Sequence, residues 1–334
     1  MNRNSLVLGL VLCFVIIFGG GKANAAQIQA ETRPATLLVS GMESGSGSAV
    51  GPDGALYVTE GATGSVLRVD PQTGNTTTFA TGLPDQLFPI GGAMDIAFID
   101  DTAYVLVTLV GPELGGTPGD VVGIYRVDGP SSFTVIADIG AWSIAHPPST
   151  AYFAPTGVQY AIQSYRGGFL VTDGHHNRVL WVTLDGEVSE LIAFGNTVPT
   201  GLEVWGNTVY MTEAGPVPHL PQDGKVISFE FNSPTPIPMA SGAPLLVDVE
   251  FGLGRNLYAL AQGDYSGAGE GSPALPNTGS LVEVNADGTF TVITTGLDRP
   301  TSLEFIGNTA YVITLTGEIW KIENVSNPPF GGSK

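Results

Sequence analysis

Cysteine is nearly absent from this chain, in which Cys13 is the single example. It lies in an apolar stretch near the N-terminus, and Leu12 precedes it where a lipoprotein signal requires a small residue. Because this stretch has the features of a segment that is removed on export, no cysteine is expected in the mature chain. Disulfide bonds, a thiol nucleophile and a lipid anchor are therefore not expected.

Basic residues are also scarce. The 334 residues include 12 lysines and arginines against 31 aspartates and glutamates, which gives a formal net charge of −19. Such a chain repels nucleic acid and anionic membrane surfaces, so neither is expected as a partner. Charged residues make up 13% of the chain, whereas 46 glycines and 24 prolines accompany an apolar content of 43%. This composition favours many short, buried strands joined by turns.

Long apolar runs are limited to residues 6–18. Arg3 precedes this run and the small-residue sequence Ala23-Asn24-Ala25 follows it, which predicts a signal peptide over residues 1–25 with cleavage after Ala25. The run is shorter than the roughly 20 residues that cross a bilayer core, so no membrane anchor is expected in the mature chain. We therefore expect a secreted or periplasmic monomer with one domain over residues 26–334.

A repeated pattern runs through the rest of the chain: a small residue, any residue, an aliphatic, a bulky apolar, any residue, an apolar and a polar residue. Six copies occur, at residues 64–70, 122–128, 177–183, 224–230, 279–285 and 317–323. A second strand pattern precedes each copy, at 56–60, 103–107, 169–173, 209–213, 257–261 and 310–314. Further strands are predicted before each pair and after it. Four antiparallel strands in each of six units predict an all-β fold, a six-bladed β-propeller.

The two ends of the chain complete the repeat. The sixth unit ends after its third strand, and residues 36–39 (TLLV) resemble the fourth strands of the other units. Pairing of this N-terminal strand with the last unit would close the ring and remove exposed sheet edges. A β-sandwich is the alternative architecture, but it does not predict six copies of one pattern.

Histidines are concentrated at one predicted rim of the ring. The loops between second and third strands lie there with the links between blades, and the longest of them are at 111–120, 215–223 and 263–277. His175, His176 and His219 are candidate catalytic acids, bases or metal ligands, because an imidazole titrates near neutral pH. His146 is a candidate for ligand binding at the rim. Since no fixed spacing such as HxxxH is present, exposed loop histidines without a catalytic role are the alternative.

Three second strands end in a threonine followed by a carboxylate. This pattern places Glu60, Asp173 and Glu213 at the channel mouth as candidate ligands of one metal ion, and Asp264 of the fifth unit could join them. Oxygen ligands of this kind suit Ca²⁺ or Mg²⁺. The alternative is that each carboxylate accepts backbone N–H groups in its own turn.

Aromatic residues near the same loops could stack on a flat ligand, or could instead hold long loops against the blades. The candidates are Trp142, Tyr152, Phe153, Tyr165 and Tyr265. No Gly-x-Ser-x-Gly elbow, phosphate-binding loop or dinucleotide fingerprint occurs in the sequence, so no candidate for nucleophilic catalysis is identified.

Four stretches resemble the ScyD/ScyE family of exported propellers: GPDGALYVTEGATGSVLRVDPQTG at 51–74, APTG and FLVTDGHHNRVLWVTLDGEV within 154–188, VPTGLEV at 198–204, and GSLVEVNADGTFTVITTGLDRPTSLEF at 279–305. The first and third units also look like NHL repeats, with Asp173 followed by Asn177-Arg178. The resemblance covers nearly the whole mature chain. It implies an exported accessory or binding protein, and it carries over no catalytic residue. Wider architectural relatives are the SMP-30-like and gluconolactonase-like propellers and streptogramin B lyase, which are metal-dependent.

Three functional hypotheses follow. The leading one is an accessory or binding propeller that presents its loop-rich rim to a small molecule or a protein partner. The second is a metal-dependent hydrolase or lyase of the gluconolactonase or streptogramin lyase type, which acts at the channel mouth. The third is a structural or protein-docking ring that binds no small molecule.

Overall fold

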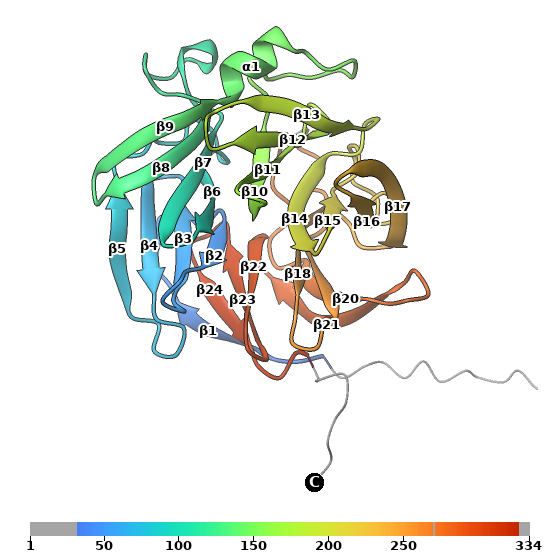
Figure 1. Cartoon of the computed structure of the whole chain (residues 1–334). Helices are drawn as coiled ribbons and strands as arrows, with labels where there is room; N and C mark the ends of the chain where they lie inside the picture. The colour runs from blue at the N-terminus through green and yellow to red at the C-terminus, as the bar shows by residue number, and fades with distance from the viewer. Residues whose placement is uncertain (1–31, 270, 327–334) are drawn as a thin grey trace, which may run out of the picture.

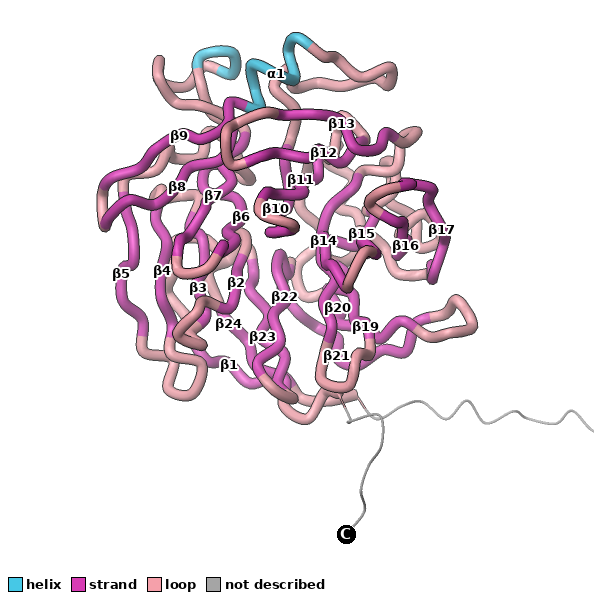
Figure 2. Tube along the Cα trace, in the orientation of Figure 1, coloured by secondary structure: helices cyan, strands magenta, loops and turns pink. Residues whose placement is uncertain are grey.

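The computed structural model describes residues 32–269 and 271–326. The predicted signal peptide, residues 1–25, lies outside these described residues. Six four-stranded antiparallel sheets are arranged around a central axis as the blades of a propeller (Figure 1). Strands make up almost all of the regular structure, as Figure 2 shows. The prediction of an all-β, six-bladed propeller is therefore confirmed.

Within each blade the strands follow one another from the axis outward. The first, innermost strands are β2 (Ser48–Val50), β6 (Gly92–Ile99), β10 (Gln159–Tyr165), β14 (Pro199–Trp205), β18 (Leu246–Phe251) and β22 (Pro300–Ile306). The second strands are β3 (Leu56–Glu60), β7 (Thr102–Thr108), β11 (Gly168–Asp173), β15 (Thr208–Glu213), β19 (Leu257–Ala261) and β23 (Thr309–Thr314). The third strands are β4 (Ser65–Val69), β8 (Gly123–Gly129), β12 (Arg178–Thr183), β16 (Lys225–Glu230), β20 (Gly279–Val284) and β24 (Ile319–Ile322).

The outermost, fourth strands are β5 (Thr76–Thr81), β9 (Ser132–Asp138), β13 (Val188–Ala193), β17 (Ser233–Ser241), β21 (Phe290–Leu297) and β1 (Ala35–Val39). The last of these comes from the N-terminal end of the described chain. It pairs antiparallel with β24, with Ala35 opposite Ile322 and Leu37 opposite Trp320. The sixth blade therefore has the order β1-β24-β23-β22, which confirms the predicted closure of the ring.

Neighbouring blades pack through apolar side chains of their second strands. Strands β3 and β19 are buried at every position, because each has a blade on both faces. Leu106 of β7, for example, belongs to the same cluster as Phe169 and Val171 of β11 in the next blade. Full burial of one such side chain contributes about 1.5–3 kcal/mol. These inter-blade clusters form the core of the ring.

Two aspartates of the inner strands join three consecutive blades each. Asp95 of the second blade accepts a hydrogen bond from the backbone N–H of Ile162 in the third blade, at 2.8 Å. On its other side it lies against Gly47 of the first blade, where a Cβ would come within 2.6 Å of the Asp95 Cα. Asp248 of the fifth blade likewise accepts from the Leu303 N–H of the sixth blade, at 2.7 Å. In both halves of the ring, an inner-strand aspartate thus accepts a hydrogen bond from a backbone N–H of the next blade.

Two short helices lie outside the blades: the 3-10 helix η1 (Pro112–Leu114) in a loop of the second blade, and α1 (Ile139–Ala145) in the link to the third blade. The sequence predicts a long link there but not the helix. Asp138 begins α1, because its Oδ1 accepts a hydrogen bond from the Ala141 N–H at 2.8 Å. Within the described part of the chain, no helix has the length and apolar character needed to cross a membrane.

Candidate functional site

The two ends of the ring differ in construction. One end, here called the loop rim, carries the loops between second and third strands and the links between blades; the other, the hairpin rim, carries the turns between first and second strands. The inner strands enclose a channel between them. A cavity opens at each end, and both cavities meet a narrower section lined by Tyr160, Asp95 and Asp248.

The cavity at the loop rim, here called the mouth cavity, has a volume of about 70 Å³. Most of its wall is apolar and includes Val158, Val198, Leu245 and Val247. Polar side chains interrupt this wall at six positions, namely Tyr160, His175, Thr200, His219, Gln262 and Ser272. None of the described residues that line it is an aspartate or glutamate. The described wall of the mouth cavity is therefore mainly apolar and carries no carboxylate.

An apolar trough of about 280 Å³ adjoins the mouth cavity. Both are walled by Ile90 and by residues 271–273, and Phe153 lines the trough. Eight large apolar side chains on the surrounding loop rim are more than one third exposed: Leu87, Phe88, Ile144, Tyr152, Phe153, Val217, Leu220 and Leu275. Exposed apolar residues that gather in this way mark interaction surfaces, whereas single ones need no explanation.

Each of the four rim histidines lies against one of the predicted aromatic residues. The ring centroids are 4.4 Å apart for Trp142 and His146, 5.0 Å for Tyr152 and His176, 4.6 Å for Phe153 and His175, and 5.5 Å for Tyr265 and His219. The aromatic residues thus pack against the loops that carry the histidines. Their predicted role in stacking on a ligand stays a prediction.

His176 takes part in a buried network in the third blade. Its Nε2 lies 2.9 Å from the carbonyl oxygen of Ala154, so this nitrogen carries the proton and donates. Its Nδ1 then accepts from Arg178, whose Nη2 is 2.9 Å away. Arg178 is 1% exposed and also pairs with Asp173, at 3.0 Å. Both ring nitrogens of His176 are therefore engaged within the fold.

Arg178 connects this network to the link between the second and third blades. It donates to the His146 carbonyl oxygen at 2.7 Å and to the Ser143 Oγ at 3.1 Å. Its guanidinium lies 4.8 Å from the ring centroid of Trp142. The buried guanidinium of Arg178 therefore holds α1 and the residue that follows it in place at the loop rim.

The three predicted metal ligands lie in three separate blades, and two of them, Glu60 and Asp173, are engaged in hydrogen bonds. Glu60 accepts from the Glu43 N–H at 2.7 Å, and Asp173 accepts from Val158 N–H and from Arg178. Glu213 is 5% exposed, and burial raises its pKa to about 7 although Lys225 lowers it in part. The described residues hold no group of three His, Cys, Asp or Glu side chains that could bind a metal ion. Asp264, the possible fourth ligand, is exposed in its loop.

The threonines of the same motif connect blades. Thr59 Oγ1 donates to the Met94 carbonyl of the second blade at 3.1 Å. Thr172 Oγ1 donates to the Thr200 carbonyl of the fourth blade at 2.7 Å. Both hydroxyls are buried, where an unpaired polar group would be costly. The threonines of the pattern that suggested a metal site therefore have a structural role: they join neighbouring blades.

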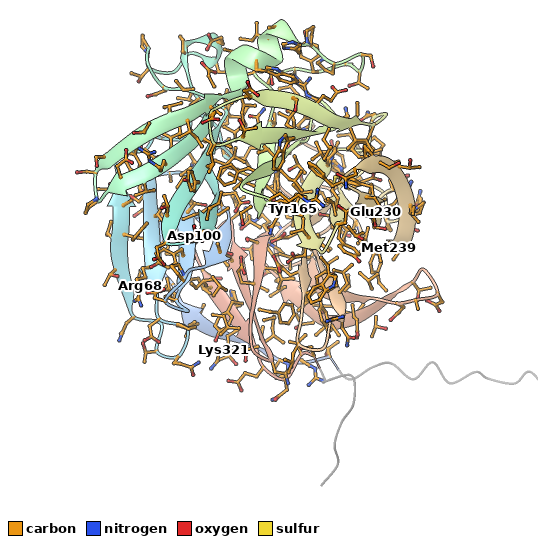
Figure 3. All side chains as sticks on the ribbon, in the orientation of Figure 1. Arg68, Asp100, Tyr165, Glu230, Met239 and Lys321 are labelled. Atoms are coloured by element: carbon orange, nitrogen blue, oxygen red, sulfur yellow. The ribbon has the colours of Figure 1, made fainter. Side chains whose placement is uncertain are left out.

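The prediction that Tyr165 lies near the loop rim is wrong. Tyr165 ends β10 and stands opposite Gly168, so it lies at the hairpin rim (Figure 3). Its hydroxyl donates to the Gly206 carbonyl at 3.2 Å, and its ring packs with Trp181 and Phe231. The error arose because Tyr165 is close in sequence to a loop of the loop rim but lies at the far end of the strand that follows this loop.

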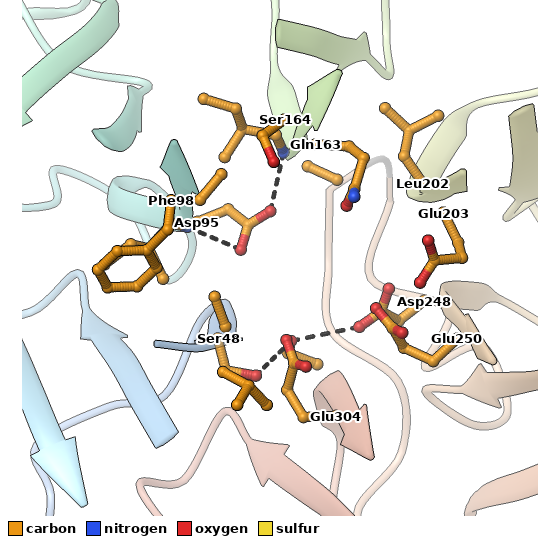
Figure 4. Close-up of a pocket in the computed structure, with 17 residues that line it drawn as sticks. Ser48, Asp95, Phe98, Gln163, Ser164, Leu202, Glu203, Asp248, Glu250 and Glu304 are labelled. Atoms are coloured by element: carbon orange, nitrogen blue, oxygen red, sulfur yellow. Dashed lines mark hydrogen bonds between the residues drawn. The ribbon is translucent and has the colours of Figure 1, made fainter. Parts of the chain in front are cut away.

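A group of carboxylates at the hairpin rim escaped the sequence analysis. A chamber of about 230 Å³ is lined by Asp95, Glu203, Asp248, Glu250 and Glu304, which Figure 4 shows around one space. No lysine or arginine is among the described residues that line it. Three of these carboxylates lie at equivalent positions of the consecutive inner strands β14, β18 and β22, namely Glu203, Glu250 and Glu304. An alignment of the inner strands with one another would have revealed them.

Burial shifts these carboxylates toward their neutral forms. Desolvation raises the pKa of Glu250 and of Glu304 well above the usual range, and the neighbouring carboxylates add to the shift. The pKa of Asp248 rises to about 7, with desolvation again the main cause. Because the charges would repel one another at close range, the chamber retains protons at a pH where exposed carboxylates have lost them.

No family model matches this chain, and no curated protein matches it in sequence. Solved structures of propellers do match. A gluconolactonase from Xanthomonas campestris is 11% identical with a TM-score of 0.61, and the match covers 87% of this chain and 89% of that one. An aldose sugar dehydrogenase from Streptomyces coelicolor with bound PQQ is 14% identical with a TM-score of 0.59, covering 87% and 98%.

A catalytically inactive variant of virginiamycin B lyase from Staphylococcus aureus, with quinupristin, is 12% identical with a TM-score of 0.55. That match covers 87% of this chain and 99% of the lyase. At such low identity these likenesses concern the six-bladed propeller fold alone. Because one fold carries many activities, function has to be argued from the residues of this chain.

Proposed function

We propose that this protein is an exported binding or accessory propeller that takes up a small, largely apolar molecule in the mouth cavity. The observation that carries the proposal is the mouth cavity itself: an apolar wall interrupted by a few convergent polar groups is the usual build of a small-molecule site. The adjoining trough and the exposed apolar side chains of the loop rim extend the same surface.

Export and family membership are parts of the same proposal. They rest on the apolar run before Ala25 and on the stretches that resemble the ScyD/ScyE family. A binding protein outside the cytoplasm also agrees with the strong excess of acidic residues, which keeps the chain away from nucleic acid and anionic membranes.

Binding of a neutral fluorescent probe, N-phenyl-1-naphthylamine, tests the proposal. Ile90 lines both the mouth cavity and the trough, so Ile90→Asp would place a charge in both. We expect saturable binding to the wild type and binding at least tenfold weaker in Ile90→Asp. The matched control is Ile237→Asp, because Ile237 is 59% exposed on an outer strand. No saturable binding to the wild type, or equal loss in both variants, contradicts the proposal.

A hydrolase or lyase at the same cavity is the second candidate. It is favoured by the two candidate histidines, His175 and His219, that line the mouth cavity, since a neutral imidazole can act as a general base. Turnover of a simple aromatic lactone, measured with and without Ca²⁺ or Mg²⁺, distinguishes this enzyme from a binding protein. Turnover that His175→Ala or His219→Ala abolishes would establish the second candidate.

A further inference from the structure

Gln262 is the best placed polar group of the mouth cavity. It directly follows β19, is 6% exposed and lines the cavity wall. Its Oε1 accepts a hydrogen bond from the Ala274 N–H at 3.0 Å, which fixes the orientation of the amide. Among the described residues nothing accepts a hydrogen bond from its Nε2, whose two hydrogens are therefore available to whatever occupies the cavity.

Tyr160 provides a hydroxyl in the same wall. It lies on β10 and lines both the mouth cavity and the narrower section of the channel. Burial raises the pKa of its hydroxyl, and the nearby Asp248 and Asp95 raise it further. The hydroxyl therefore keeps its proton and can donate, and within the described chain its oxygen makes no hydrogen bond.

The loop that carries Ala274 also connects the polar and apolar parts of the surface. Residues 271–273, just before Ala274, form a common wall of the mouth cavity and the trough. If the Gln262 amide holds one group of a ligand, the rest of that ligand would lie along this shared wall. Apolar surface at that end is available from Phe88, Leu109 and Phe153.

We propose that the ligand of the mouth cavity is an apolar molecule that carries a carbonyl-type oxygen, held by the Nε2–H of Gln262. This inference rests on the proposed function and names the chemical class that the site takes. A cationic amino group is disfavoured there, because none of the described residues that line the cavity is an aspartate or glutamate. A bound ligand covers the Nε2–H, and a covered donor without an acceptor is costly, so a ligand that supplies an acceptor is selected over an isostere that does not.

Two probes of closely similar size and shape test the inference: 2-acetylnaphthalene, which has a carbonyl oxygen, and 2-isopropenylnaphthalene, in which a CH₂ group replaces that oxygen. We expect the wild type to bind the ketone three- to tenfold more tightly, as one hydrogen bond allows. Gln262→Glu, measured at pH 8.5, keeps the acceptor for the Ala274 N–H and replaces the donor by an oxygen. We expect this variant to lose the preference.

The matched control is Gln163→Glu, because Gln163 lines the carboxylate chamber at the opposite rim. This variant should keep the preference for the ketone, and thermal unfolding of all three proteins checks that they fold. Equal binding of the two probes to the wild type, or a preference that survives in Gln262→Glu, overturns the inference. If neither probe binds, the proposed function itself has failed, so the two failures are distinguishable. The wild-type comparison stands even if Gln262→Glu does not fold.

Discussion

Glu213 offers a direct test of how burial controls charge in this ring. It ends β15 and stands opposite Lys225 of β16. Its pKa is raised from the ordinary value of 4.5 to about 7, mainly because burial removes water from the carboxylate. Replacement by glutamine keeps the size and shape of the side chain while it removes the titration. The perturbation is therefore confined to one proton.

The sign of the effect follows from proton binding. Between pH 4.5 and 7 the folded state binds this proton more tightly than the unfolded chain does, so the free energy of unfolding falls as the pH rises through that window. The loss is nearly complete about one pH unit above the folded pKa, near pH 8. For a folded pKa of about 7, the linkage relation gives a loss of about 2.5 kcal/mol between pH 5 and pH 8. Glu213→Gln should lack this loss.

Urea unfolding followed by tryptophan fluorescence at pH 5, 6, 7 and 8 measures the difference. We expect Glu213→Gln to become more stable relative to the wild type as the pH rises, with most of the gain below pH 7. The control is Asp287→Asn, because hydrogen bonds from Thr289 lower the pKa of Asp287 and take its titration below this range. If the relative stability of Glu213→Gln changes by less than about 0.5 kcal/mol between pH 5 and 8, the burial argument is wrong.

Three further predictions concern the core of the ring. Arg178→Met should lower the free energy of unfolding by about 3–5 kcal/mol, since it removes the buried guanidinium that pairs with the Asp173 carboxylate. An Arg178→Met Asp173→Asn double variant that recovers none of this loss in urea unfolding would contradict the reasoning. Gly47→Ala should lower the free energy of unfolding by about 1–3 kcal/mol, because the new Cβ would clash with Asp95 and with the Met94 carbonyl oxygen. A midpoint of thermal unfolding equal to that of the wild type would refute this prediction. Glu250→Gln should stabilise the protein at pH 8 and change little at pH 5, because the raised pKa makes the charged form unfavourable; an equal effect at both pH values would speak against it.

Much of the fold could be predicted from the sequence because its pairings are local. Each second strand is followed by its third within a few residues or one loop, so a repeated seven-residue pattern marks the blades directly. The closure by residues 36–39 was also predictable, since the last unit lacks one strand and a ring cannot leave an edge unpaired. The helix α1 was missed because its seven residues lie in a loop without an apolar repeat.

The candidate site was less predictable, as the threonine-carboxylate motif illustrates. Its spacing placed Glu60, Asp173 and Glu213 at one rim, but spacing does not say whether a side chain turns to the axis or to its own blade. In the structure Asp173 turns to Arg178, and Glu60 turns to a backbone N–H. The role of Gln262 had no sequence signal, because a single glutamine has no pattern.

The sequence by itself determined the number of blades, the way the ring closes and the rim on which the histidines lie, because each of these follows from the order and period of strands along the chain. Only the tertiary structure decided which side chains share a space. The five carboxylates of the chamber come from four blades, and the mouth cavity takes residues from loops nearly two hundred positions apart. Such groups meet only when the ring is closed, because burial and the pKa shifts that depend on it arise from neighbours that no local pattern brings together.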